Sequence, residues 1–273
     1  MSNNFYQKLI TEKHIFVMGI LNVTPDSFSD GGKYLNINSA TEHTFEMIED
    51  GADIIDIGGE SSRPGAEEVS TNEEINRTIP VIESILKQKP NTIISIDTTK
   101  SEVAEVALQS GVKIINDISG LSDPKMLEIV KKYDASVVIM HMQGKPRTMQ
   151  ENPKYDNVFD EVFTFLQQKV ELAKNYGISS IIIDPGIGFG KSVNHNYDLL
   201  INFAKFQTLE TPLLIGVSRK SLIGKALNLS VEDRDVATII LETDAIIKGA
   251  KIVRTHNVKN AVQLRELNNL LNR

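Results

Sequence analysis

The chain has 273 residues, of which 41% are hydrophobic and 24% are charged, and its formal net charge is −7. It contains no cysteine, which excludes disulfides, zinc–thiolate sites, iron–sulfur clusters and cysteine nucleophiles. The acidic balance argues against nucleic acid or an anionic membrane as the main partner. With no signal pattern and no apolar run of about 18 residues, we expect a cytoplasmic protein without a membrane segment.

Short apolar segments alternate with longer segments of helical period along the chain. The short ones are rich in β-branched residues and apolar throughout, which is typical of parallel strands covered on both faces. In chain order they read HIFVMGIL, ADIIDIGG, NTIISID, VKIIND, ASVVIMH, SSIIIDPG, TPLLIGVS and AKIVRTH.

The longer segments predict helices. Apolar residues three or four positions apart form one stripe at Ile75, Ile79, Ile82 and Leu86, and another at Val162, Leu166, Val170 and Ala173. About eight strand candidates, each followed by a helix candidate, predict an α/β fold, a (β/α)8 TIM barrel. No linker divides residues 1–273, so we expect a single domain. A doubly wound open sheet is the alternative, but it usually has fewer strands and its nucleotide-binding motif is missing.

Polar side chains follow the candidate strands, whereas the helix-to-strand connections are short and lack such clusters of polar residues. The polar residues at the strand ends are Asn22, Glu60, Asp97, Asn116, Asp117, His141, Asp184, Arg219, Lys220, Arg254 and His256. The carboxyl ends of barrel strands open onto one face, where active sites are built. The pattern therefore predicts one convergent site. Two polar stretches, 19–32 at the end of the first strand and 58–70 at the end of the second, are predicted to form lids.

The acceptors at these ends indicate a flat ligand. A buried carboxylate needs partners, and a heterocycle with adjacent N–H and amino donors would satisfy one of Asp97, Asn116 or Asp184 bidentately. Apolar walls for such a ring are available from Ile118, Met140 and Phe189.

Cations that suit phosphate or carboxylate come late in the chain. They are Lys191, Arg219, Lys220, Arg254 and His256. The segment 218–221 ends a strand and starts a probable helix, so backbone N–H groups add to an anion site there. Lys191 is interpreted as a residue that could be merely solvated. Together the pattern predicts a planar ligand, rich in hydrogen-bonding groups, with an anionic tail.

The sequence resembles the dihydropteroate synthase family over nearly its whole length. The matching motifs, in order, are MGILNVTPDSFSDGG, DIIDIGGESSRPG, SIDT, INDISG, DPGIGFGK, GVSRKS and RTHNV. The resemblance implies a barrel enzyme that joins 6-hydroxymethyl-7,8-dihydropterin pyrophosphate to p-aminobenzoate in folate synthesis and releases pyrophosphate, with Mg2+. It also implies a homodimer and a pocket that accepts sulfonamide inhibitors.

The resemblance further implies roles for individual residues. The pterin would be held by Asp97, Asn116, Asp184 and Lys220, with its amino-pyrimidinone edge facing Asp184. Mg2+ would be bound by the side-chain oxygen of Asn22, a hard ligand suited to that ion. Pyrophosphate would be held by Arg63, Arg254 and His256, assisted by Ser62, where many members have threonine. The p-aminobenzoate pocket would be formed by Phe28, Pro64, Arg219 and Ser221. A direct part in catalysis is expected of Asp30, Asp97, Lys220 and Arg254, with Asp30 assisting the metal or the developing cation.

An SN1-like order is expected, because an arylamine is already nucleophilic at pH 7 and needs no strong general base. Two alternatives stay open. A pterin-binding methyltransferase module would share the barrel but need no pyrophosphate site. A non-catalytic pterin-binding or regulatory paralogue should have eroded lid loops.

Overall fold

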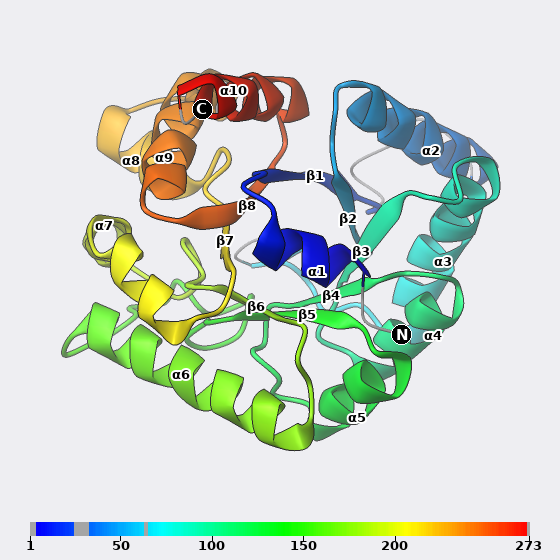
Figure 1. The fold of residues 1–273 in the computed structure, drawn as a ribbon, viewed down its shortest axis with the longest axis horizontal. Coiled ribbons are helices and arrows are strands. Elements are labelled where there is room, and N and C mark those ends of the chain that lie inside the picture. The colour runs from blue at the N-terminus through cyan, green and yellow to red at the C-terminus, as the bar shows by residue number, and fades with distance from the viewer. Residues whose placement is uncertain (1–3, 25–32, 63–64, 272–273) are drawn as a thin grey trace.

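The computed structural model describes residues 4–24, 33–62 and 65–271. Within these ranges eight parallel strands close into a barrel in chain order, each paired with the next and β8 with β1 (Figure 1). The strands are β1 (Phe16–Asn22), β2 (Ile54–Gly58), β3 (Ile93–Asp97), β4 (Ile114–Asp117), β5 (Ser136–Met140), β6 (Ile181–Asp184), β7 (Leu213–Ile215) and β8 (Ala250–Thr255). The predicted (β/α)8 barrel and all eight predicted strands are confirmed.

Helices surround the barrel and connect its strands (Figure 1). Those after β1 to β5 are α2 (Lys33–Glu49), α3 (Thr71–Gln88), α4 (Ser101–Gln109), α5 (Pro124–Tyr133) and α6 (Val158–Tyr176). Those after β6 to β8 are α7 (Val193–Ile201), the 3-10 helix η2 (Phe203–Leu209), α8 (Ser221–Leu227), the 3-10 helix η3 (Glu232–Arg234), α9 (Asp235–Ile247) and α10 (Val258–Leu271). Among the described residues, no helix is both long and apolar enough to cross a membrane.

The strands are apolar on both sides because they separate two cores. Outward-facing residues such as Ile55 and Ile183 pack against the apolar stripes of the helices, including Ile82 and Leu166. Inward-facing residues such as Met18 and Ile182 fill the barrel. This double burial explains why the strands appear in the sequence as continuous apolar runs rather than as alternating ones.

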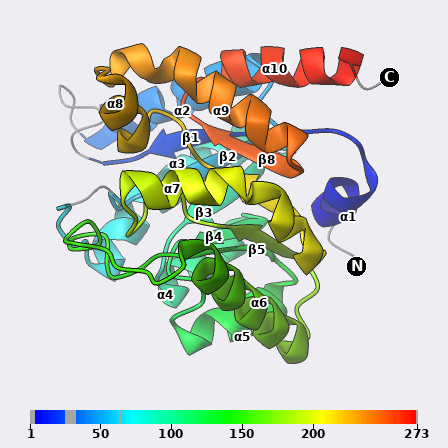
Figure 2. The same cartoon turned by 90° about the vertical axis from the view of Figure 1, so that its left-hand side faces the viewer.

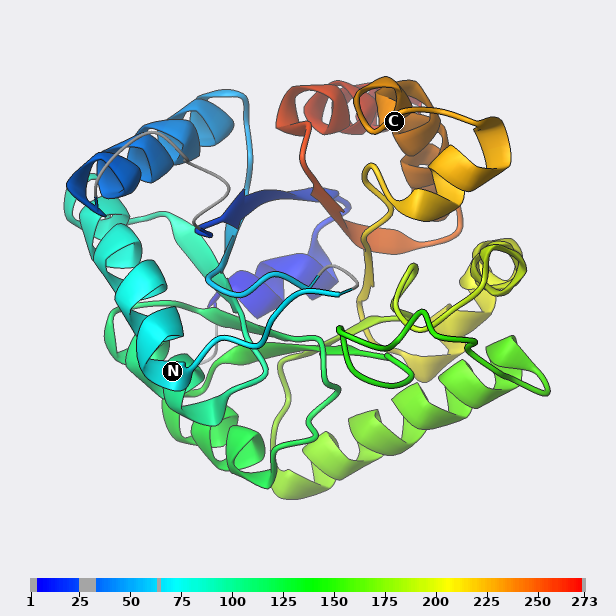
Figure 3. The same cartoon turned by 180° about the vertical axis from the view of Figure 1, so that it is seen from behind.

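An additional helix, α1 (Asn4–Thr11), closes one end of the barrel. Phe5 and Leu9 are buried and join the interior cluster formed by the inward-facing strand residues. Each such side chain contributes roughly 1.5–3 kcal/mol when fully buried. Figure 2 shows α1 at one end and the longer connections at the other, so the mouth of the barrel lies at the carboxyl ends of the strands. Figure 3 looks onto that mouth.

Candidate active site

One row of strand residues forms part of the rim of the mouth. Asn22 is in register with Gly58, Gly58 with Asp97, and Asp97 with Asn116, so four neighbouring strands place these residues at one level. A Cβ added to Gly58 would lie 3.5 Å from Cβ of Asp97 and 3.9 Å from Oδ1 of Asn22. Glycine at this position therefore leaves space between the proposed metal ligand and the first acidic residue.

Arg254 of β8 is held across the mouth by two carboxylates. Its Nε donates to Oδ2 of Asp56 at 2.6 Å, and its Nη2 donates to Oδ2 of Asp97 at 2.8 Å. Nδ2 of Asn116 also donates to Oδ2 of Asp56, at 2.9 Å. Asp56 is completely buried and therefore fixes the orientation of both the guanidinium and the amide. Because its amide nitrogen is engaged by Asp56, Asn116 has its Oδ1 available as an acceptor.

The second acidic residue of the mouth is Asp184, at the end of β6. Its Oδ1 accepts a 2.7 Å hydrogen bond from the backbone N–H of Gly186. Burial raises the pKa of Asp184, whereas the charges of Lys220, Arg254 and Lys191 lower it. Since Arg254 acts on both Asp97 and Asp184, the two predicted acceptors belong to one site.

Lys220 is the cation beside Asp184. The pKa of Lys220 is lowered to about 8, mainly by burial and also by the charge of Arg254, whereas the charges of Asp184 and Asp97 raise it. Its Nζ donates to the carbonyl of Ile187 and lies 4.5 Å from the centre of the Phe189 ring, a cation–π arrangement. Lys220 is thus held over the loop that follows Asp184.

The carboxyl of Asp97 has an unusual environment. Burial raises its pKa to about 7, Arg254 lowers it, and the carboxylates of Asp56, Glu74 and Asp117 raise it. A carboxyl balanced in this way can accept or donate a hydrogen bond to a polar ring. The predicted apolar walls Ile118 and Met140 are buried, and Phe189 is half-buried.

His256 and Ser218 lie at the ends of neighbouring strands β8 and β7. The Ser218 hydroxyl contacts Nδ1 of His256 at 3.0 Å and accepts from its backbone N–H at 3.1 Å. The imidazole is exposed and stands two positions after Arg254. A cation, an imidazole and a hydroxyl are suitable groups for an anion at this part of the rim.

Two residues predicted for the p-aminobenzoate pocket, Arg219 and Ser221, flank Lys220 in the sequence. Arg219 has a backbone φ of +55° and forms a bidentate ion pair with Asp235, at 2.6 and 2.9 Å. Its guanidinium is therefore held at the start of α9. Ser221 is exposed at the start of α8. Their role remains a prediction.

The connection after β2 is anchored by a buried ion cluster. Lys100 donates to Glu60 and, at 2.7 Å, to Oε2 of Glu74, which is completely buried. This cluster holds the base of the loop in which Ser62 lies half-buried. Arg63 and Pro64 of that loop, and Phe28 and Asp30 of the loop after β1, lie outside the described residues. The two lid loops therefore remain a prediction.

Several residues of the mouth were missed by reasoning from the sequence. Asp56 was available as a lone carboxylate within the apolar run ADIIDIGG, but it was not singled out as a partner for Arg254. Glu74 and Lys100 gave no signal, because charged residues on helices and loops are usually solvated. Lys191, interpreted as possibly solvated, is in fact buried.

The donor set at Asn22 fits Mg2+ only in part. Its Oδ1 is a hard oxygen at the rim beside Asp97, and Mg2+ is commonly held by few protein ligands together with water and substrate phosphates. Within the described part of the chain, no group of three or more His, Cys, Asp or Glu side chains could hold a metal ion.

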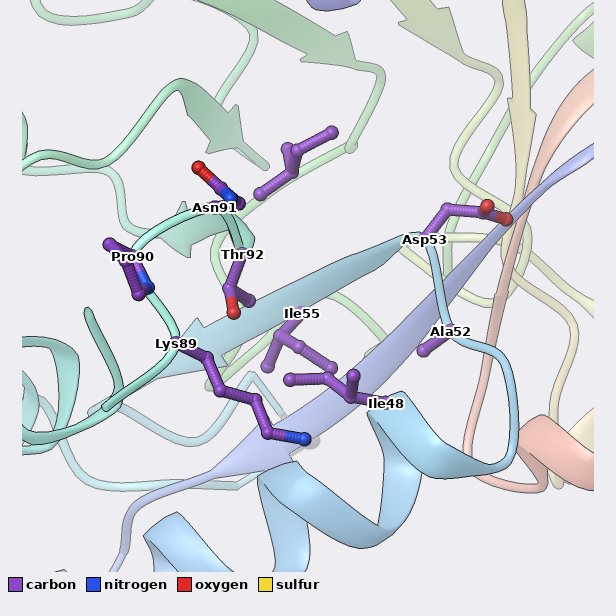
Figure 4. Close-up of a pocket in the computed structure, with 9 residues that line it drawn as sticks. Ile48, Ala52, Asp53, Ile55, Lys89, Pro90, Asn91 and Thr92 are labelled. Carbon is purple, nitrogen blue, oxygen red and sulfur yellow. The ribbon is translucent and has the colours of Figure 1, made fainter. Parts of the chain in front are cut away.

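A separate hollow of about 420 Å3 lies near the opposite end of the barrel (Figure 4). It is lined by Ile48, Ala52, Asp53, Ile55, Lys89, Pro90, Asn91, Thr92 and Ile93. Its one carboxylate, Asp53, is already bonded to His14, to Arg265 and to the N–H of Val17. Asp97, Asp184 and Lys220, three groups with shifted pKa values that act on one another or on Arg254, lie at the other end, so we assign the chemistry to the mouth.

The closed barrel with a charged mouth at the strand carboxyl ends defines the class, a TIM-barrel enzyme. Residues 18–256 match the family of pterin binding enzymes. The chain is 48% identical to the dihydropteroate synthase of Escherichia coli K12 over 252 residues, which cover 92% of this chain and 89% of that one. The chain belongs to the dihydropteroate synthase family of pterin-binding enzymes.

Solved structures show the same relationship. The structure of the Yersinia pestis dihydropteroate synthase with a sulfonamide drug complex superposes with a TM-score of 0.88 at 42% identity, covering 95% of this chain and 94% of that chain. The Xanthomonas albilineans dihydropteroate synthase in complex with 7,8-dihydropteroate superposes with a TM-score of 0.86 at 37% identity, with the same coverage.

Proposed function

We propose that the protein condenses 6-hydroxymethyl-7,8-dihydropterin pyrophosphate with p-aminobenzoate to give 7,8-dihydropteroate and pyrophosphate. The observation that carries this proposal is the mouth that Asp184, Lys220 and Arg254 share. A Cβ at Gly216 would lie 3.8 Å from Nζ of Lys220 and 3.9 Å from Cβ of Arg254, and the charges of both cations lower the pKa of the Asp184 carboxyl. In this proposal Asp184 is the acidic group for the pterin ring, and Lys220 and Arg254 are the nearby cations for the diphosphate. The product and sulfonamide complexes of the family members named above support the same assignment.

The pterin ring is bound by the acceptors at the rim. Asp184 receives the adjacent N–H and amino donors of the pyrimidinone edge, and Asn116 offers Oδ1 to a further ring donor. Lys220 donates to a ring acceptor from the Phe189 side. Ile118 and Met140 exclude water from the ring faces, which strengthens these hydrogen bonds.

The diphosphate lies toward Arg254, His256 and the hydroxyl of Ser218, with Arg63 and Ser62 of the loop after β2 assisting. Asn22 would hold Mg2+, which when bound supplies a Lewis acid for the phosphate oxygens. Arg254 is positioned before substrate arrives by Asp56 and Asp97. A cation fixed in this way stabilises the charge that develops on the leaving group without reorganising.

We further propose that the bond from the pterin methylene to the diphosphate oxygen breaks before the amine attacks. Its electron pair leaves with pyrophosphate, and the resulting cation is delocalised into the dihydropterin. The amine of p-aminobenzoate then forms the new C–N bond and loses one proton to solvent. Phe28, Pro64, Arg219 and Ser221 form the pocket for this substrate, and Asp30 assists near the metal.

The proposed setting is a cytoplasmic homodimer of single-domain chains spanning residues 1–273. Support for the dimer comes from large apolar side chains exposed on α9 and α10, including Ile240, Ile247 and Leu267, which are 62%, 76% and 60% exposed. Contiguous exposed apolar surface is characteristic of protein interfaces.

The function is tested by incubating the protein with both substrates and Mg2+ and measuring 7,8-dihydropteroate and pyrophosphate. Equal amounts of the two products are expected. A protein that transfers a methyl group or only binds pterin would release no pyrophosphate, and that result would overturn the proposal.

The order of bond changes needs a separate test. The pterin pyrophosphate is labelled with 18O at the oxygen that joins the pterin methylene to the diphosphate, and p-aminobenzoate is omitted. In a stepwise route the label should exchange with non-bridging oxygens of the diphosphate. A complete absence of exchange or cleavage would favour a concerted displacement.

A further inference from the structure

Lys191 is a buried lysine with no carboxylate within hydrogen-bonding distance in the described part of the chain. It follows the loop 185–190 and is only 2% exposed. Its Nζ contacts four groups: the carbonyl oxygens of His141, Gly186 and Phe189, at 3.2, 2.9 and 3.0 Å, and Nδ1 of His141, at 2.9 Å. A buried lysine normally requires a functional or structural reason, because burying a charge is costly.

These contacts indicate a protonated amine. Carbonyl oxygens can only accept, and burial together with the charge of Lys191 lowers the pKa of His141 to about 3, so that the imidazole is neutral. With its proton on Nε2, the ring is a fourth acceptor at Nδ1. A neutral amine would offer two N–H donors to four acceptors, whereas an ammonium offers three. Burial lowers the pKa of Lys191 itself well below its ordinary value and the charge of Lys220 also lowers it, whereas the charge of Asp184 raises it; the assignment of an ammonium therefore rests on the four acceptors around Nζ.

The ammonium joins the two loops that frame the pterin cradle. His141 directly follows β5, and Gly186 and Phe189 belong to the loop after β6. Gly186 is the residue whose N–H bonds Asp184, and a Cβ there would come within 1.9 Å of the His141 carbonyl oxygen. The two backbones are therefore in direct contact, and Lys191 bonds to both sides of that contact.

We propose that Lys191 is a positioning residue of the pterin site, whose ammonium fixes the 185–190 loop against His141 and thereby sets the orientation of Asp184. This inference rests on the proposed function, since it assigns Asp184 to the pterin edge. Lys191 itself donates to protein acceptors. It acts on the ring through the Gly186 N–H and through its positive charge near Asp184.

The same geometry makes the charge of Lys191 part of the environment of Asp184. The charged groups acting on Asp184 are Lys220 after β7, Arg254 of β8 and Lys191 after β6; His141 of the β5 side is neutral. Removal of Lys191 takes away one of three cations that favour the ionised carboxylate. The pKa of Asp184 should then rise. As pH is lowered, the variant should therefore lose pterin binding at a higher pH than the wild type does.

The test compares wild type with Lys191→Met, titrated calorimetrically with the pterin pyrophosphate and separately with inorganic pyrophosphate. Methionine replaces the buried ammonium by an apolar chain of similar length and leaves its four acceptors without that donor, so thermal unfolding of the variant is measured alongside. We expect roughly a tenfold or greater loss of pterin affinity, an unchanged affinity for pyrophosphate, and a low-pH limit of pterin binding that moves to higher pH.

Lys169→Met is the control for loss of a lysine that donates to a backbone carbonyl, because Lys169 is half-buried and donates to that of Leu121, at 3.2 Å. It should bind both ligands like the wild type. If Lys191→Met does not fold, His141→Leu removes the imidazole acceptor while keeping the lysine, and it should lower pterin affinity in the same selective way.

Equal pterin affinity in wild type and variant would overturn the inference, as would equal losses for both ligands without a pH shift. A wild-type protein that binds no pterin pyrophosphate would instead overturn the proposed function.

Discussion

Lys220 shows how burial can tune a single residue for a ligand. Its ammonium lies over the ring of Phe189 and is attracted by the charge of Asp184, and its pKa is lowered to about 8, chiefly by burial. The protonated form dominates below that pH and is the form that can donate to a pterin and attract a diphosphate. The charge of the mouth therefore depends on pH in a range that experiments can reach.

We predict that kcat/KM for the pterin substrate falls as pH rises through about 8 in the wild type. In Lys220→Arg this alkaline fall should disappear, because a guanidinium stays charged, although the activity itself should be lower. The measurement is kcat/KM across neutral and alkaline pH for both proteins. The same alkaline limit in both would show that another group titrates.

Asn22 is the only metal ligand expected from the sequence, and the structure places it beside Asp97 at the rim. We predict that Asn22→Ala keeps its thermal stability but needs a higher Mg2+ concentration for half-maximal turnover, by about tenfold or more. The check is a titration of activity with Mg2+ alongside thermal unfolding. An unchanged Mg2+ dependence would exclude this residue as a ligand.

The site residues found from the sequence are those at strand ends, because the polar-after-apolar pattern marks them. Asp97, Asn116, Asp184, Lys220 and Arg254 belong to this group, and the structure brings them to one mouth. Lys191 could not be assigned, since nothing in a sequence separates a lysine held by four acceptors from a solvated one. Pairings between distant strands, such as Asp56 with Arg254, depend on the barrel having closed.

At the scale of elements, α9 carries a titratable group against the barrel. Glu242 is completely buried in α9, neither of its carboxyl oxygens has a hydrogen-bond partner in the described part of the chain, and burial raises the pKa of the carboxyl to about 8. A carboxyl whose pKa is higher in the folded than in the unfolded state binds its proton more tightly when folded. Its stabilising contribution is full below about 4.5 and is lost as pH rises toward 8.

Glu242→Gln should therefore become more stable than the wild type as pH rises, by roughly 2–4 kcal/mol near pH 8 relative to pH 4.5. The measurement is urea unfolding of both proteins at these two pH values. A difference in stability that does not change with pH would show that Glu242 titrates normally.

Strands and helices were predictable from the sequence because the strands are continuous apolar runs, whereas the helices carry apolar residues three or four positions apart. Helix α1 was not, since its two buried contacts, Phe5 and Leu9, are too few to give a period. The helix gains its stability from closing the barrel, a contact made with strands far along the chain. Helix α3 continues through Pro80. The apolar stripe predicted one continuous helix here, although a proline usually ends or kinks a helix.

At the scale of the whole molecule, α9 and α10 lie side by side on the outside of the barrel (Figures 1 and 2). Val236, Ile240 and Ile247 of α9 are exposed, as are Leu267, Leu270 and Leu271 of α10. The buried residues of α9 are Thr238, Glu242, Ala245 and Ile246, so the helix carries apolar side chains both toward the barrel and on its exposed side. This exposed apolar surface is the one that we propose as the dimer interface.

We predict that Ile240→Glu shifts the protein from dimer to monomer, because it places a charge in the proposed interface. Ile201→Glu is the matched control, since Ile201 is similarly exposed on α7 but lies away from this surface. Sedimentation velocity gives the masses of both variants and the wild type. A monomeric wild type, or an unchanged dimer in Ile240→Glu, would contradict this interface.

The central claim is that Asp184 presents the acidic cradle for a pterin beside the cations that hold its diphosphate. The most direct measurement is the calorimetric affinity of wild type and Asp184→Asn for 6-hydroxymethyl-7,8-dihydropterin pyrophosphate, with inorganic pyrophosphate as the reference ligand. We predict a loss of at least about a hundredfold for the pterin ligand, since a charged bidentate contact is removed, and little change for pyrophosphate. Equal binding of the pterin ligand by the two proteins would contradict the account.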